Sequence, residues 1–233
     1  IKKENNDDNF IKIYEGNEMN YLVNNLDSNT NYEIRICSVY NDINSIYSEI
    51  KKVKTNEFDS LILNESNRCD EFIRKIYEWS GYNNMKLLYR GTRDGMEANY
   101  FHNKCNNQGP TISLFKNDKG YIFGGYASTD WTSCNNYKSA PESFIFTLTN
   151  IHGTEPTKFP NSNTSYSIDD QSSYGPTFGG GYDIRIYKNG SYSNFPHSYQ
   201  DILGKGKSIF TGDLNNNNQT FKLKEIEVFK IFK

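Results

Sequence analysis

The sequence predicts a mainly β fold with short helices, an α+β arrangement in which strands supply most of the core. Aromatic residues make up 15% of the 233 residues, with 18 Tyr and 15 Phe, and aromatic side chains are enriched in strands. Short segments in which apolar and polar residues alternate recur along most of the chain. Only one longer stretch, near residue 70, has the spacing of an amphipathic helix.

The first 57 residues differ from the rest, because they contain no Trp, no Pro and a single Gly. Four alternating segments predict strands at 10–14, 21–23, 32–36 and 50–53. Leu26 and Tyr32 resemble the tyrosine corner of a fibronectin type III domain, an immunoglobulin-like sandwich. Such a domain has about 100 residues. Residues 1–57 are therefore expected to form the C-terminal half of a fibronectin type III-like domain.

A helix is predicted over 67–79, with Ser66 as its cap and Gly81 as its stop. Its apolar residues follow the i, i+3, i+4, i+7 spacing of one buried face: Cys69, Phe72, Ile73, Ile76 and Tyr77. The spacing of Asp94 and Glu97 is that of a capping box, so a second, short helix is expected over 94–105.

Strands are predicted for most of the remaining chain, at 86–90, 111–116, 121–126, 143–149, 182–187, 208–211 and 221–232. The last of these has an unusual pattern. Its apolar residues change phase after Leu223 and again after Val228, so neither face is polar throughout. A strand that buries residues on both faces is usually central in its sheet.

The residues give little support for catalysis or cofactor binding. Gly206-Lys207-Ser208 lacks the glycine at position 201 that a phosphate-binding loop needs, and a strand is expected after it. The Gly179-Gly180-Gly181 run is interpreted as a tight turn or bulge between strands. The three His and four Cys residues show no metal-binding spacing, and no nucleophile elbow occurs. We therefore expect no metal, no cofactor and reduced cysteines.

Net charge and hydropathy bear on whether the protein binds nucleic acid, spans a membrane or is secreted. The formal net charge is -2 with a pI near 6.0, which argues against binding to a nucleic-acid backbone. No apolar run approaches the roughly 20 residues of a membrane span, and the first residues lack a secretion signal. The sequence therefore predicts a cytoplasmic protein.

From residue 58 onward, a series of motifs resembles the TLDc domain of the oxidation-resistance family. In order they are 87–95 (LLYRGTRDG), 101–105 (FHNKC), 109–111 (GPT), 120–126 (GYIFGGY) with Trp131, 175–183 (GPTFGGGYD) and 224–229 (KEIEVF). This resemblance implies a TLDc domain over 58–233, a two-sheet antiparallel β-sandwich flanked by helices. It also implies a role in oxidative-stress protection, and several relatives bind the vacuolar proton-pumping ATPase.

Two hypotheses of function follow. The first is a non-catalytic protein-interaction domain, in which the candidate partner-binding side chains are Arg90, Arg93, Glu225 and Glu227. The alternative is an enzyme such as a hydrolase, or a thiol-dependent peroxide scavenger that uses Cys105 and His102. The residues expected to have a structural role in the motifs are Gly91, Asp94, Gly95, Gly124, Gly125, Gly179 and Gly180. The partner and the oligomeric state cannot be predicted from the sequence.

Overall fold

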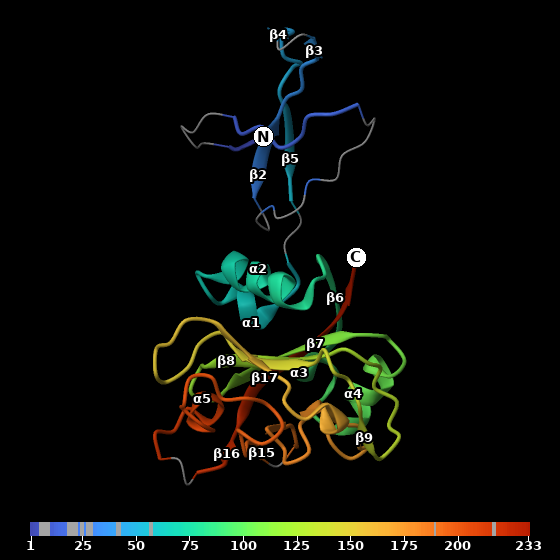
Figure 1. Ribbon diagram of the computed structural model, residues 1–233, viewed down its shortest axis with the longest axis vertical. Helices are drawn as coiled ribbons and strands as arrows, with labels where there is room; N and C mark the ends of the chain where they lie inside the picture. The colour runs from blue at the N-terminus through green and yellow to red at the C-terminus, as the bar shows by residue number, and fades with distance from the viewer. Residues whose placement is uncertain are drawn as a thin grey trace. The chain divides into compact units, whose positions relative to one another are not determined.

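The computed structural model describes residues 1–4, 10–17, 23, 26, 30–40, 43–55, 58–188, 190–215 and 218–233. The chain divides into two compact units, Ile1–Asp59 and Ser60–Lys233. Figure 1 shows both units.

The first unit contains a three-stranded antiparallel sheet and a small hairpin. The sheet has the order β1-β2-β5, with β1 at Lys2–Lys3, β2 at Asn31–Ile34 and β5 at Lys51–Lys54. The hairpin joins β3 (Val39–Tyr40) to β4 (Ile43–Asn44). The strands predicted at 32–36 and 50–53 are thus confirmed. Most of the predicted 21–23 strand and the turn after Leu26 lie outside the described residues.

The strand predicted at 10–14 is wrong. Phe10 contacts the Arg35 guanidinium, whose carbon lies 3.9 Å from the centre of the ring, and the described residues 10–14 form no ladder. Ile11 also exchanges two backbone hydrogen bonds of 2.9 Å with Ile1. One backbone pair and a cation–π contact therefore hold the segment in place of a continuous ladder, and alternation in the sequence cannot distinguish the two arrangements. The fibronectin type III-like assignment of residues 1–57 stays a prediction.

The second unit is a two-sheet antiparallel sandwich, as the family resemblance implied. The first sheet has the order β11-β10-β8-β7-β17-β6. Its strands are β6 (Asn84–Arg90), β7 (Thr111–Asn117), β8 (Ile122–Ala127), β10 (Phe144–Thr147), β11 (Thr157–Pro160) and β17 (Leu223–Phe232). The strands predicted at 86–90, 111–116, 121–126 and 143–149 correspond to four of these. The one predicted at 221–232 corresponds to β17 except for Phe221, which lies in a strand of the second sheet.

The second sheet has the order β16-β15-β14-β13-β12-β9 and consists of very short strands. They are β9 (Tyr137–Lys138), β12 (Ile168–Asp169), β13 (Thr177–Phe178), β14 (Ile184–Arg185), β15 (Ser191–Tyr192) and β16 (Thr220–Phe221). The prediction for 182–187 was too long, because Tyr182 belongs to the preceding turn with a φ of 63°. Aromatic and aliphatic side chains of both sheets, among them Phe115, Phe123, Phe178 and Ile184, form the core between them.

The prediction that the last strand is central in its sheet is confirmed for β17. It pairs with β7 on one side and with β6 on the other, so it is an interior strand. Its register shifts between Leu223 and Glu225 against β7, and between Val228 and Phe229 against β6. The first shift skips Lys224 on β17 and so exchanges the faces of this strand, whereas the second skips Leu88 on β6 and leaves the pairing of β17 with β7 regular. The first change of phase in the sequence thus marks a bulge in β17. The second reflects burial on both faces, because Val228 and Phe229 are both buried although they point to opposite sides of the sheet.

Two helices cover the outer face of the first sheet (Figure 1). α1 (Leu61–Asn64) and α2 (Cys69–Ser80) bury Ile62, Leu63, Phe72 and Ile76, and the Trp79 ring lies 5.8 Å from that of Phe146 on β10. The predicted helix at 67–79 is confirmed, and Gly81 ends it in the left-handed conformation. The N-cap residue of α2 is Arg68 and not the predicted Ser66, and the Arg68 side chain makes no capping hydrogen bond.

The region predicted as one capped helix over 94–105 contains two. α3 (Gly91–Asp94) ends at Gly95, and α4 (Ala98–Cys105) begins after Glu97. Gly95 has a φ of 111°, which an L side chain rarely adopts and which interrupts the helix. Asp94 therefore does not cap α4. Its Oδ2 instead accepts a hydrogen bond of 3.0 Å from the backbone N–H of Arg90, at the start of α3.

The strand predicted at 208–211 is also wrong, because Ser208–Thr211 forms the short helix α5. All four residues are buried, so they have no polar face. Periodicity cannot separate a strand from a helical turn in so short an apolar run. The Oγ of Ser208 donates to the Lys205 carbonyl, and Gly212 ends the turn in the left-handed conformation.

Candidate interaction site

Three of the four predicted partner-binding side chains are buried in the second unit. Arg90 is 9% exposed, Glu225 is 6% exposed and Glu227 has no exposed surface. The Nε of Arg90 lies 2.7 Å from Oε1 of Glu227. Glu227 also accepts hydrogen bonds from the Ser60 hydroxyl at 2.6 Å and from the Leu61 backbone at 2.9 Å. This carboxylate therefore joins β6, β17 and the start of α1.

Glu225 has a comparable role at the start of α3. Its Oε1 accepts from the Thr92 backbone N–H at 3.1 Å, and its Oε2 accepts from the Thr92 hydroxyl. Arg93 differs, because its side chain is 46% exposed and pairs with Asp94 at 2.7 Å. The exposure that the interaction hypothesis expects is thus present at Arg93 and absent at the other three. Partner binding by these residues stays a prediction.

The glycines of the motifs lie where a side chain would collide with packed neighbours. A Cβ on Gly124 would lie 2.1 Å from the Ser113 carbonyl, and one on Gly125 would lie 2.5 Å from the Phe178 ring. Gly91 similarly makes room for Ile226, and Gly180 for Tyr166. These close approaches are typical of structural glycines in a packed sandwich.

The Gly179–Gly181 run forms the turn between β13 and β14, as predicted, and it surrounds a buried carboxylate. A Cβ on Gly179 would lie 1.9 Å from Oδ2 of Asp183. Asp183 accepts from the backbone N–H groups of His197 at 2.6 Å and Ser198 at 2.8 Å. Burial raises the pKa of Asp183 to about 6, although these hydrogen bonds act in the opposite direction. The sequence analysis did not identify this group.

The residues of the enzymatic alternative do not form a nucleophile–base pair in the positions described. Nε2 of His102 lies 3.0 and 2.9 Å from the carbonyl oxygens of Gln171 and Tyr174, while Nδ1 lies 2.9 Å from Asn106. Cys105 is fully buried, and burial raises the pKa of its thiol. The His102 ring thus links α4 to the loop before β13.

Within the described ranges, no group of three or more His, Cys, Asp or Glu side chains could hold a metal ion. Among the same residues, no helix is both long and apolar enough to cross a membrane.

The most distinctive surface feature is a cluster that the sequence analysis missed, which we call the Arg185 face. It consists of Arg185 on β14 and four tyrosines around it: Tyr174, Tyr182, Tyr187 and Tyr192. The carbon of the guanidinium lies 4.5 Å from the ring centre of Tyr182, 5.0 Å from that of Tyr174 and 5.3 Å from that of Tyr192. Such contacts are cation–π interactions. Tyr187 adds an edge-on contact with Tyr174 at 5.8 Å.

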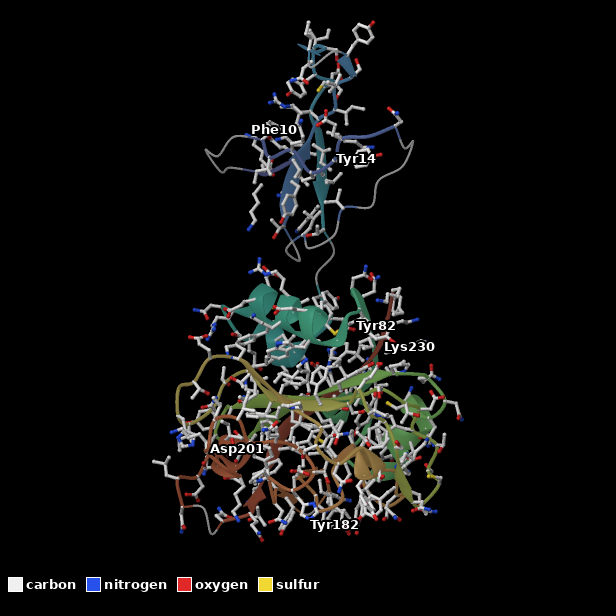
Figure 2. All side chains as sticks on the ribbon, in the orientation of Figure 1. Phe10, Tyr14, Tyr82, Tyr182, Asp201 and Lys230 are labelled. Carbon is white, nitrogen blue, oxygen red and sulfur yellow. The ribbon has the colours of Figure 1, made fainter. Side chains whose placement is uncertain are left out.

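The Arg185 face lies on the outer side of the second sheet. Ile184 and Ile186 are buried, so alternation along the strand directs Arg185 away from the core. Figure 2 shows Tyr182 at the side of the second unit that lies farthest from α1 and α2. Tyr187 is 43% exposed, whereas the other members are half-buried. The cluster is therefore an aromatic surface with a cation held at its centre.

A second charged group lies near this face. Asp169 on β12 is 2% exposed, and burial is the main cause that raises the pKa of its carboxyl group, while the charge of Arg185 lowers it. Within the described residues, Oδ1 of Asp169 and Nε of Arg185 have no hydrogen-bond partner. The tyrosine rings take the place of a direct ion pair around the guanidinium. Two features of the sequence could have indicated the Arg185 face: the four tyrosines over 174–192, and the position of Arg185 between two isoleucines in a strand pattern.

Comparison with known proteins agrees with this architecture. The chain is 30% identical over 63 residues to the MTOR-associated protein MEAK7 of Danio rerio, a match that covers 27% of this chain and 14% of that protein. The chain thus aligns with a small part of that relative. The family model of the TLDc domain matches residues 56–232, about three quarters of the chain. With this match and the two-sheet sandwich, the chain belongs to the TLDc domain family.

Proposed function

We propose that this chain is a non-catalytic protein-interaction domain that binds its partner through the Arg185 face. The observation that carries this proposal is the guanidinium of Arg185 surrounded by three tyrosine rings on the outer side of the second sheet. Tyr and Arg are enriched among the residues that contribute most to binding energy at protein interfaces. Family membership supports an interaction role of the same kind.

Two physical properties suit this face to binding. Tyrosine provides a large contact area at a low entropic cost, because its ring has only two rotatable side-chain bonds. The ring contacts also hold Arg185 in place before a partner arrives, which reduces the ordering cost of association. Arg185 and its rings can therefore supply both apolar contact area and a bidentate donor for a carboxylate.

The partner we propose is a subunit of the vacuolar proton-pumping ATPase, in keeping with the TLDc relatives, and the role is in protection against oxidative stress in the cytoplasm. The similarity to MEAK7, a protein named for its association with MTOR, supports a regulatory protein complex in a more general way. The enzymatic alternative rests on Cys105 and His102, and their burial and hydrogen bonds favour the interaction role.

The test is quantitative capture of binding partners by the full chain. Three immobilised proteins are compared by mass spectrometry: wild type, Arg185→Glu and Lys75→Glu. Lys75 lies on α2, which covers the outer face of the first sheet, and it is a matched charge-reversal control. We expect ATPase subunits on wild type and Lys75→Glu, with loss on Arg185→Glu. Equal capture by all three proteins would contradict the role of the Arg185 face.

A further inference from the structure

A recess of about 260 Å³ opens beside the Arg185 face, where the first sheet, the second sheet and α4 meet. Its floor is apolar and is formed by side chains that belong to the core or pack against it: Tyr89, Met96, Phe101, Ile186, Leu223 and Ile226. Tyr187 belongs both to the wall of the recess and to the Arg185 face, so the two are continuous.

The size of the recess suits one large side chain. A cavity of about 150 Å³ lined by apolar residues accommodates benzene, so 260 Å³ has room for a Trp, Phe or Leu side chain. Protein interfaces typically place such an anchor in a preformed pocket near the centre of the contact.

The rim is positively charged. Lys188 pairs with Glu97 at 2.5 Å, and both side chains are about half exposed. Lys222 is exposed, and no ion pair to it is present among the described residues. The charged side chains that line the recess are thus Lys188 and Lys222 against Glu97, which leaves one cation in excess at the rim. A partner with a carboxylate beside its apolar anchor is complementary to this charge.

We infer that the recess binds an aromatic or large aliphatic side chain of a protein partner, with an adjacent Asp or Glu directed toward Lys222. This inference rests on the proposed function and deepens it, because it names the chemistry of the segment that the domain recognises. The anchor covers the apolar floor, and the carboxylate specifies the direction in which the segment crosses the rim.

Blocked dipeptides are suitable probes, and the binding is followed by nuclear magnetic resonance of the full chain. The probes are N-acetyl-Trp-Asp-amide, N-acetyl-Trp-Lys-amide and N-acetyl-Ala-Asp-amide. We expect the first to shift the methyl signals of Ile186, Leu223 and Ile226 in a saturable way. Replacing Asp by Lys should weaken binding about threefold, as the loss of an exposed ion pair does. The Ala probe should not bind measurably.

Variants of residues in the recess test whether the probes bind there. Ala98→Phe places a ring in the recess and should abolish binding of the Trp probes, while Lys222→Glu should reverse the preference between Asp and Lys. Lys224→Glu, a matched charge reversal two residues along the chain and outside the recess, should leave it unchanged. Melting curves of the variants verify that each is folded.

Three results would overturn the inference. They are an absence of shifts at the recess, equal binding of the Trp probe to Ala98→Phe, and decanoate binding more tightly than the Trp-Asp probe, which would indicate a lipid-like ligand instead. Failure of the inference is distinguishable from failure of the proposed function. If Arg185→Glu still abolishes capture of the partner while the recess variants bind the probe as wild type does, only the inference is wrong.

Discussion

Arg90 and Glu227 form an ion pair of 2.7 Å in which the carboxylate has no exposed surface. The same carboxylate accepts from Ser60 and from the backbone of Leu61, so one side chain on β17 orders both the end of β6 and the start of α1. The motif residues 224–229 thus have a structural role in the sandwich, although their charges suggested a surface.

Replacing Glu227 with Ala should lower the free energy of unfolding by about 3–5 kcal/mol, because Arg90, the Ser60 hydroxyl and the Leu61 backbone would all lose the buried carboxylate that they contact. Arg93→Ala is the matched control, since the Arg93 side chain is 46% exposed and its ion pair with Asp94 should contribute less than about 1 kcal/mol. Urea unfolding of both variants measures the difference. Similar losses for the two would show that the Glu227 pair does not stabilise the fold in this way.

Much of the second unit could be predicted because its patterns are local. The α2 stripe ends at Gly81 in the structure, and the apolar residues on both faces of β17 correspond to its interior position between β6 and β7. The site could not be predicted, because the tyrosines around Arg185 come from different turns and strands and meet only when the second sheet forms. Charge in a motif was a misleading guide, since Glu225 and Glu227 are both buried.

Asp183 should make stability depend on pH in the direction opposite to an ordinary surface carboxylate. Burial raises its pKa from 3.8 to about 6. Between these values the folded chain retains a proton that the unfolded chain has lost, so stability falls as pH rises through this window. Each pKa unit corresponds to about 1.4 kcal/mol, and we expect a contribution of up to about 3 kcal/mol.

The measurement compares the wild type with Asp183→Asn, which stays neutral at every pH. The unfolding free energy of wild type minus that of the variant should decrease from pH 4 to pH 7 and then stay level. A difference that is constant, or that increases over this range, would contradict the raised pKa.

The second unit should fold without the first. Its two sheets and the helices that cover them lie within Ser60–Lys233. A fragment that begins near residue 56 should therefore melt in one cooperative transition and retain the near-ultraviolet circular dichroism of packed aromatic rings. A molten product would indicate that residues 1–57 complete the core.

The cysteines should not support peroxide turnover. Burial raises the pKa of Cys69 to about 11 and that of Cys105 still further, so neither provides a thiolate near neutral pH. Cys134 is exposed, and a thiol reagent should modify it first. Cys134→Ser should remove the fast phase of modification. Multiple-turnover loss of peroxide that is abolished by Cys105→Ser would establish the enzymatic alternative.

The central claim is that the Arg185 face is the surface that contacts the protein partner. Amide hydrogen exchange of the full chain, alone and with the purified vacuolar ATPase or the protein enriched by capture, tests this most directly. We predict slower exchange on binding in 174–188 and 190–192, with little change in α2. Protection confined to α2 or to residues 1–57, with none around Arg185, would contradict the account.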